Sequence, residues 1–311
     1  MNPRFPARSA LFAVALLAFA GCRSLGPLGV GAECWSLDGR ALVSPPPAAD
    51  TAARLAADLT EAERAHAARP DDRDAAIWHA RRLGYLGRYR DAVAVLTEAL
   101  ARHPGDPFLL RHRGHRWLTL REFARARADL LAAAVACRTT PDVTEPDGQP
   151  TPGRPPHSSL HYNVHYHLGL ACFLLGDWDA AERAWLCCLA VVDDDESRVA
   201  VTHWLWCARM RAGDQAGAFA VVAPIHAGMD VVENVAYQNL CLLYRGDRSR
   251  ADLAPRAGSS GSALAFGLAH HALATGDRVR ARGELQALVA SPGWSAFGVI
   301  AAEAELARWR D

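Results

Sequence analysis

The sequence repeats its pattern of residue types every 34 positions over much of its length. Ala92 is followed by Ala126 and Leu96 by Leu130, each pair 34 residues apart. A period of this length is typical of helical-hairpin units, which bury their apolar faces against neighbouring copies. The chain is therefore predicted to be a stack of helical hairpins, and the abundance of alanine and leucine favours helix throughout.

Further copies follow at irregular intervals. A third copy lies 55 residues beyond the second, as Gly114 and Gly169 show, which is one repeat plus 21 residues. A fourth lies a further 100 residues on, with Gly276 equivalent to Gly176. That second interval leaves room for two degenerate copies.

This pattern resembles the tetratricopeptide repeat (TPR), a 34-residue helix-turn-helix with small residues where its helices cross and an aromatic residue nearby. The resemblance implies an all-α fold, a right-handed α-solenoid of TPR-like helical hairpins with almost no sheet. We expect a first group of helices over residues 49–138, beginning with a lone helix from Ala49 to Ala68. Residues 160–311 would hold the later repeats and a capping helix.

The first residues are similar to a bacterial lipoprotein signal. Arg4 and Arg8 precede an apolar run of eleven residues, which is too short to span a bilayer, and "AGC" ends at Cys22. Residues 1–21 would then be the signal peptide and Cys22 the lipidated residue. Residues 22–48, rich in Gly and Pro, would tether the protein to the periplasmic face of the outer membrane. An ordinary secretory signal is the alternative.

The 21-residue insertion, residues 139–159, contains six prolines. Proline opposes helix formation, so this segment is predicted to be a mobile, protease-sensitive loop. The chain carries 34 Lys and Arg against 34 Asp and Glu. Such a balance gives no electrostatic reason to expect a nucleic-acid partner.

Residues that carry chemistry are sparse. Four histidines at the start of the third copy raise an alternative function, a metal-binding or enzyme-associated regulatory protein, but only His161 and His165 are spaced one turn apart inside the expected helix. Two ligands are fewer than a zinc site needs. No phosphate-binding or zinc-protease motif occurs. The sequence predicts no enzyme, metal, cofactor or small-molecule substrate, and it leaves open whether the cysteines pair.

The resemblance implies a concave groove that holds a protein or peptide partner. The function predicted is therefore a non-catalytic interaction scaffold attached to the cell envelope. The repeat register gives the inner-helix positions, which we expect to be largely exposed: Ile77, Arg81, Tyr85, Arg111, His115, Tyr166, Phe266 and His270.

Overall fold

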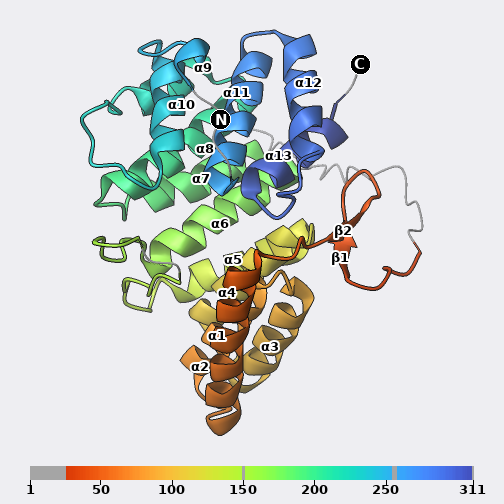
Figure 1. Cartoon of the computed structure of the whole chain (residues 1–311). Helices are drawn as coiled ribbons and strands as arrows, with labels where there is room; N and C mark the ends of the chain where they lie inside the picture. Colours follow the sequence, from red (N-terminus) through yellow and green to blue (C-terminus); the bar gives the residue numbers. More distant parts are fainter. Residues whose placement is uncertain (1–25, 149–150, 254–257, 310–311) are drawn as a thin grey trace, which may run out of the picture.

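The computed structural model describes residues 26–148, 151–253 and 258–309 (Figure 1). Nearly all of its regular secondary structure is helix. Its α-helices are α1 (Ala49–Ala68), α2 (Arg73–Tyr85), α3 (Tyr89–Arg102), α4 (Pro107–Thr119), α5 (Phe123–Ala136), α6 (Leu160–Leu175), α7 (Trp178–Leu189), α8 (Asp195–Ala212), α9 (Gln215–Val222), α10 (Val235–Arg245), α11 (Gly258–Ala274), α12 (Arg278–Val289) and α13 (Phe297–Ala307). A short 3-10 helix, η1 (Arg250–Asp252), follows α10.

Each helix packs mainly against its neighbours in sequence, so the predicted all-α solenoid of helical hairpins is confirmed. Helices α1–α5 form the lower part of Figure 1, and α6–α13 form the upper part. The repeat extends to the helix starts. Asp72 and Asp106, 34 residues apart, each accept two backbone N–H groups at the start of α2 and α4. Such a cap stabilises a helix by about 1 kcal/mol.

Small residues lie where paired helices cross, as the repeat predicts. Ala80 and Ala126 are buried. A Cβ atom added at Gly114 would lie 2.7 Å from the side chain of Leu130, and one added at Gly169 would lie 2.3 Å from the indole of Trp185. Glycine at these two positions therefore allows a large side chain of the second helix to fill the space beside the first.

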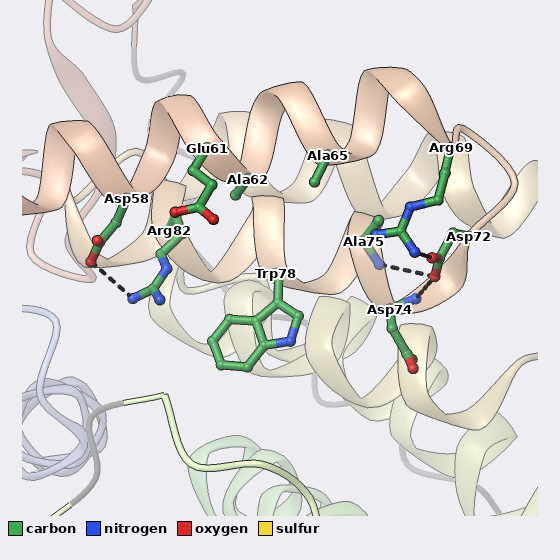
Figure 2. A pocket seen from close by; sticks show the side chains of 10 residues that line it. All are labelled: Asp58, Glu61, Ala62, Ala65, Arg69, Asp72, Asp74, Ala75, Trp78 and Arg82. Atoms are coloured by element: carbon green, nitrogen blue, oxygen red, sulfur yellow. Dashed lines mark hydrogen bonds and ion pairs between the residues drawn. The ribbon is translucent and has the colours of Figure 1, made fainter.

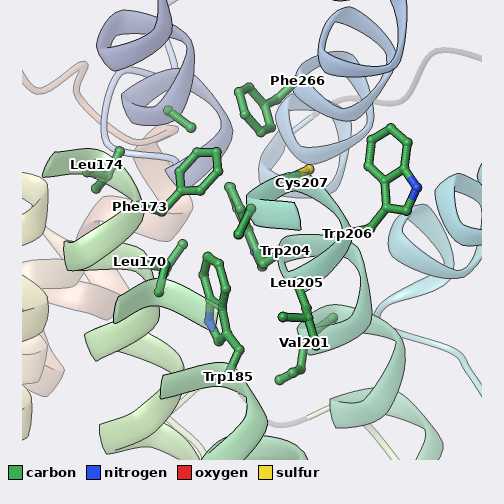
Figure 3. Packing of buried hydrophobic residues seen from close by; sticks show 14 of the residues in the cluster. Leu170, Phe173, Leu174, Trp185, Val201, Trp204, Leu205, Trp206, Cys207 and Phe266 are labelled. Carbon is green, nitrogen blue, oxygen red and sulfur yellow. The ribbon is translucent and has the colours of Figure 1, made fainter. Parts of the chain in front are cut away.

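The core is densest in the later repeats, where large aromatic side chains converge from α6, α7, α8 and α11 (Figure 3). Trp185 and Trp204 stack with their ring centroids 6.1 Å apart, and neither side chain is exposed. Phe173 and Phe266 complete the cluster, also without exposure. One apolar core thus joins the third copy to the C-terminal helices.

The segment predicted to be a Gly/Pro-rich tether, residues 22–48, contains a small β-hairpin. Strands β1 (Ala32–Trp35) and β2 (Ala41–Val43) pair antiparallel. Cys34 and Leu42 pack against Val93 of α3 and against Trp294, which precedes α13. The indole N–H of Trp294 also donates to the carbonyl of Val43 at 2.9 Å. The hairpin is held in place because it covers apolar side chains from both ends of the solenoid.

A buried ion pair also joins the early repeats to the C-terminal helix. The guanidinium of Arg121, in the turn between α4 and α5, lies 2.5 Å from the carboxylate of Glu303 on α13. The two side chains are 3% and 2% exposed. Arg121 donates to the carbonyls of Thr119 and Trp294 as well. The curvature of the solenoid therefore brings its last helix into contact with its second repeat.

Arg121 also has a backbone conformation that favours glycine. Its φ is 64°, and the equivalent residues of the other copies are Gly87, Gly176 and Gly276, with φ between 75° and 88°. A non-glycine residue in this region costs about 1–2 kcal/mol. The ion pair with Glu303 accounts for an arginine at a position where the other copies have glycine.

No helix in the described residues is long and apolar enough to cross a membrane. The predicted signal peptide and Cys22 lie outside the described residues. The seven cysteines within them are all free thiols, and six are buried.

Candidate binding groove

The inner helices of the first two repeats bring four of the predicted groove residues together. Arg81 and Tyr85 lie on α2, while Arg111 and His115 lie on α4. All four side chains are partly buried rather than open to solvent. Ile77, the fifth predicted residue in these repeats, is buried and belongs to the core.

The three predicted groove residues of the later repeats do not line an open surface. Tyr166, Phe266 and His270 are 8%, 0% and 1% exposed. The Tyr166 hydroxyl accepts a hydrogen bond from the indole N–H of Trp204 at 2.8 Å, inside the aromatic core. The expectation of exposure was wrong here because α8 and α13 pack against α6, and α11, which carries Phe266 and His270, packs against α8, α10, α12 and α13.

The proline-rich insertion was predicted to be mobile, but its first part folds back onto the inner helices. Glu145 is the one buried residue between Thr139 and Ser158 in the part that the structure describes. Its carboxylate lies 2.9 Å from the guanidinium of Arg111 and 3.4 Å from the imidazole of His112. Asn163 of α6 donates to the same carboxylate at 2.5 Å. An acidic side chain therefore occupies this part of the groove.

Burial and the neighbouring guanidinium of Arg111 set the charge states of Glu145 and His112. Burial alone would raise the pKa of Glu145, but Arg111 and the hydrogen bonds from His112 and Asn163 outweigh it and lower the pKa to about 2. Burial, with Arg111 beside it, lowers the pKa of His112 to about 3. At neutral pH the site thus holds an ionised carboxylate, a guanidinium and a neutral imidazole.

Two of the predicted groove residues, Tyr85 and His115, line a cavity of about 1130 Å³. One wall comes from α2 and α4 with the start of α3, and the opposite wall comes from α11, α12 and the loop before α13. Most of the lining is apolar or small: Pro45, Gly84, Tyr85, Tyr89, His115, Arg116, Leu253, Gly261, Ser262, Leu264, Ala265, Leu268, Glu284, Ala287, Leu288, Ser291, Pro292, Gly293, Ser295 and Ala296. The cavity is large enough to accept a peptide segment.

Arg116 gives this cavity a positive charge that no described carboxylate balances. Among the described residues it forms no ion pair, and its guanidinium contacts the ring of His115 at 2.9 Å and lies over the ring of Tyr89. A Cβ atom at Gly84 would lie 2.7 Å from this guanidinium, so glycine makes room for it. Burial lowers the pKa of Arg116 to about 10, which leaves the side chain charged at neutral pH.

A second, smaller pocket of about 370 Å³ lies between α1 and α2 (Figure 2). Its basic side chains are already paired. Arg82 lies 3.3 Å from Asp58, and Arg69 lies 2.6 Å from Asp72. Because both of its arginines are paired and its volume is smaller, this pocket is a weaker candidate than the larger cavity.

The histidines at the start of the third copy are dispersed rather than convergent. The ring of His161 contacts the carbonyl of Thr140 at 2.9 Å, whereas His167 is buried against His115, with ring centroids 4.5 Å apart. Ser159 caps α6, so His157 lies outside the helix. In residues 26–148, 151–253 and 258–309, no three His, Cys, Asp or Glu side chains are placed to hold a metal ion.

Three residues with central roles were not predicted: Glu145, Arg116 and Arg121. A signal existed for Arg121, because it replaces the glycine found at the same turn in the other copies. Arg116 could have been noted as a basic residue beside the predicted groove position His115. Glu145 carried no signal, since nothing in a proline-rich segment indicates which side chain folds back.

Comparison with known proteins adds fold-level similarity only. No protein-family model matches the sequence, and no curated protein matches it. A thermophilic TPR protein from Thermus thermophilus is 24% identical with a TM-score of 0.44, over 62% of this chain and 93% of that one. A tetratricopeptide repeat protein from Parabacteroides merdae is 15% identical with a TM-score of 0.49, over 77% and 87%. PilW, a type IV pilus biogenesis factor, is 19% identical with a TM-score of 0.47, over 78% and 87%.

Proposed function

We propose that this chain is a non-catalytic scaffold of the TPR type that binds a segment of a protein partner in the cavity between α2/α4 and α11/α12. The observation that carries the proposal is a largely apolar cavity of about 1130 Å³, lined by a charged Arg116 that forms no ion pair with a described acidic residue. Apolar lining with few polar groups is typical of sites that bind ligands. The stacked helices supply rigid walls on both sides.

The lining also indicates what a partner segment should offer. Leu264, Leu268 and Leu288 would bury its apolar side chains, and Arg116 would bind a carboxylate. A guanidinium can bind a carboxylate through two parallel hydrogen bonds, which orients the segment as well as holding it. A backbone carbonyl would be a weaker partner for the same group.

Filling the cavity should abolish binding without unfolding the protein. Ala265, half-buried on α11, faces the cavity, so Ala265→Trp would place an indole where the partner segment lies. We expect affinity purification with this variant to lose the partners that the wild-type chain recovers, with little change in melting temperature. The matched control is Ala132→Trp at an exposed site on α5, which should recover them all. Equal recovery by Ala265→Trp would contradict binding in the cavity.

We further propose that the scaffold is anchored to the bacterial cell envelope by a lipid on Cys22, at the periplasmic face of the outer membrane. The support is the short apolar run ending in "AGC" in the sequence. A chain with Cys22→Ala should lose its lipid and move from the membrane fraction to the soluble periplasmic fraction. Unchanged membrane association of this variant would rule out Cys22 as the anchor.

A further inference from the structure

The contact between Glu145 and the inner helices differs from an ordinary loop contact. The rest of the described insertion lies on the surface, and Glu145 alone is buried, at 5% exposure. The segment around it is extended. The N–H of Glu145 donates to the carbonyl of Ser158 at 2.9 Å, and Thr144 forms an isolated β-bridge with Ser159. An extended strand thus presents one acidic side chain to the groove.

The groove side of this contact is made entirely by helices. Arg111 and His112 come from α4, Asn163 comes from α6, and each contacts the carboxylate of Glu145. Arg81 of α2 donates to the carbonyl of Pro146 at 2.7 Å, which holds the backbone of the next residue. These groups would hold any extended segment that presented a carboxylate at the same point.

The groove has more positive charge than the insertion satisfies. Arg81 and Arg116 form no ion pair with a described acidic residue, and only Arg111 is paired, with Glu145. Of the three guanidinium groups on the inner faces of α2 and α4, only that of Arg111 thus has a described carboxylate within ion-pair distance. The excess charge favours an acidic occupant over a neutral or basic one.

Displacement of Glu145 by another acidic side chain would leave Arg111 with a counter-charge. If the insertion moved away, Arg111 would face water or the carboxylate of the incoming segment. The other described hydrogen bonds and ion pairs of the insertion's side chains are exposed or half-buried, including the ion pair between Arg154 and Asp230 at 2.7 Å. Surface ion pairs contribute little to stability, so the buried pair of Glu145 with Arg111 is the stronger ion pair that the insertion makes.

We propose that the site formed by Arg111, His112 and Asn163 binds an acidic side chain of an extended partner segment, and that Glu145 is a built-in competitor for it. The partner would bind by displacing the insertion and would continue past Tyr85 into the cavity. Tyr85 lines the cavity and also contacts the insertion, since a Cβ atom added at Gly148 would collide with its hydroxyl. This inference rests on the proposed function and names the chemistry of the partner.

The insertion itself supplies the probe for a test. A fluorescently labelled peptide of residues 139–148, "TTPDVTEPDG", carries the same acidic side chain in the same setting. In the wild-type chain the tethered copy competes at an effective concentration that can reach the millimolar range. The full chain with Glu145→Ala lacks this competitor. Fluorescence anisotropy should show that it binds the peptide at least about 100-fold more tightly than the wild type.

Two matched changes make the result specific. A peptide with alanine in place of its glutamate should not bind, and adding Arg111→Ala to the Glu145→Ala chain should remove binding. A chain with Glu98→Ala, a change at an exposed acid on α3, should behave as the wild type. If far-ultraviolet circular dichroism shows that Glu145→Ala loses helix, Glu145→Gln, which keeps the size of the side chain, replaces it.

The outcomes separate this inference from the proposed function. Equal peptide affinity for the wild-type and Glu145 variants, or binding that survives Arg111→Ala, would overturn the built-in competitor. Partner recovery that depends on Ala265 would still support binding in the cavity. If instead the peptide binds as predicted but Ala265→Trp recovers every partner, Glu145 would still be a competitor for its site, and the proposal that partners bind in the cavity would be wrong.

Discussion

The variant Glu303→Ala should lower the free energy of unfolding by about 3–5 kcal/mol, because it leaves the guanidinium of Arg121 buried without its counter-charge. Both side chains are almost fully buried, and Glu303 also accepts the backbone N–H of Leu37 beside the β-hairpin. Losing this one carboxylate therefore weakens the contact of α13 with the second repeat and with the hairpin. Urea denaturation followed by circular dichroism measures the change.

Two further variants test whether the ion pair is the cause. Glu98→Ala removes an acid whose side chain is 64% exposed, and it should change stability by less than about 0.5 kcal/mol. The double variant Arg121→Gly with Glu303→Ala should be more stable than Glu303→Ala alone. It leaves no unpaired charge, and glycine adopts a φ of 64° without strain. A Glu303→Ala chain as stable as the Glu98→Ala chain would show that the contact of α13 with the second repeat does not depend on this ion pair.

Gly169→Leu should destabilise the chain by about 3 kcal/mol or more, because the leucine would occupy the space of a buried indole. An added Cβ atom alone lies 2.3 Å from Trp185, whose side chain is fully buried. Neither helix of the pair α6 and α7 can move away without opening the aromatic core. Thermal unfolding should show a lower melting temperature.

The matched control is Gly283→Leu on α12, where an added Cβ atom meets nothing within 4 Å. Leucine favours helix over glycine, so this change should be neutral or stabilising by up to about 1 kcal/mol. Similar melting temperatures for the two leucine variants would mean that the close approach of α6 and α7 is not needed for stability.

Much of the helical framework could be predicted from the sequence because it is local and periodic. The 34-residue register placed Ala80 and Ala126 in the core and gave α1 its exact bounds. Helix periodicity, capping residues and small residues at crossings act within one hairpin or between neighbours. A single sequence contains these signals.

The contacts that close the solenoid could not be predicted in the same way. The pair Arg121 and Glu303 is separated by 182 residues, and the hairpin contact of Val43 with Trp294 by 251. The spacing of the repeats predicts each helical hairpin. It does not predict the small rotation between neighbouring copies, which accumulates along the chain and decides which distant surfaces meet. The β-hairpin itself had a local signal, the Asp38–Gly39 turn between apolar residues.

The same accumulated rotation explains the outcome at the predicted groove. The equivalent inner positions His115 and His270 show this: His115, in the second repeat, is partly buried beside a cavity, whereas His270, in a later repeat, is buried in the core. The same position in the repeat therefore lies in two different environments, beside a cavity in one copy and in the core in another. The acidic occupant of the groove, Glu145, lies in an inserted segment for which the repeat has no equivalent position.

Site-specific photo-cross-linking in cells tests the central claim most directly. A photoreactive residue in place of Leu268, which lines the cavity, is compared with one in place of Leu131, which is 48% exposed on the outer surface of α5. The account predicts a discrete cross-linked partner from position 268, none from position 131, and loss of the product when Ala265→Trp fills the cavity. Cross-links from position 131 alone, or a product at position 268 that persists in the filled cavity, would contradict it.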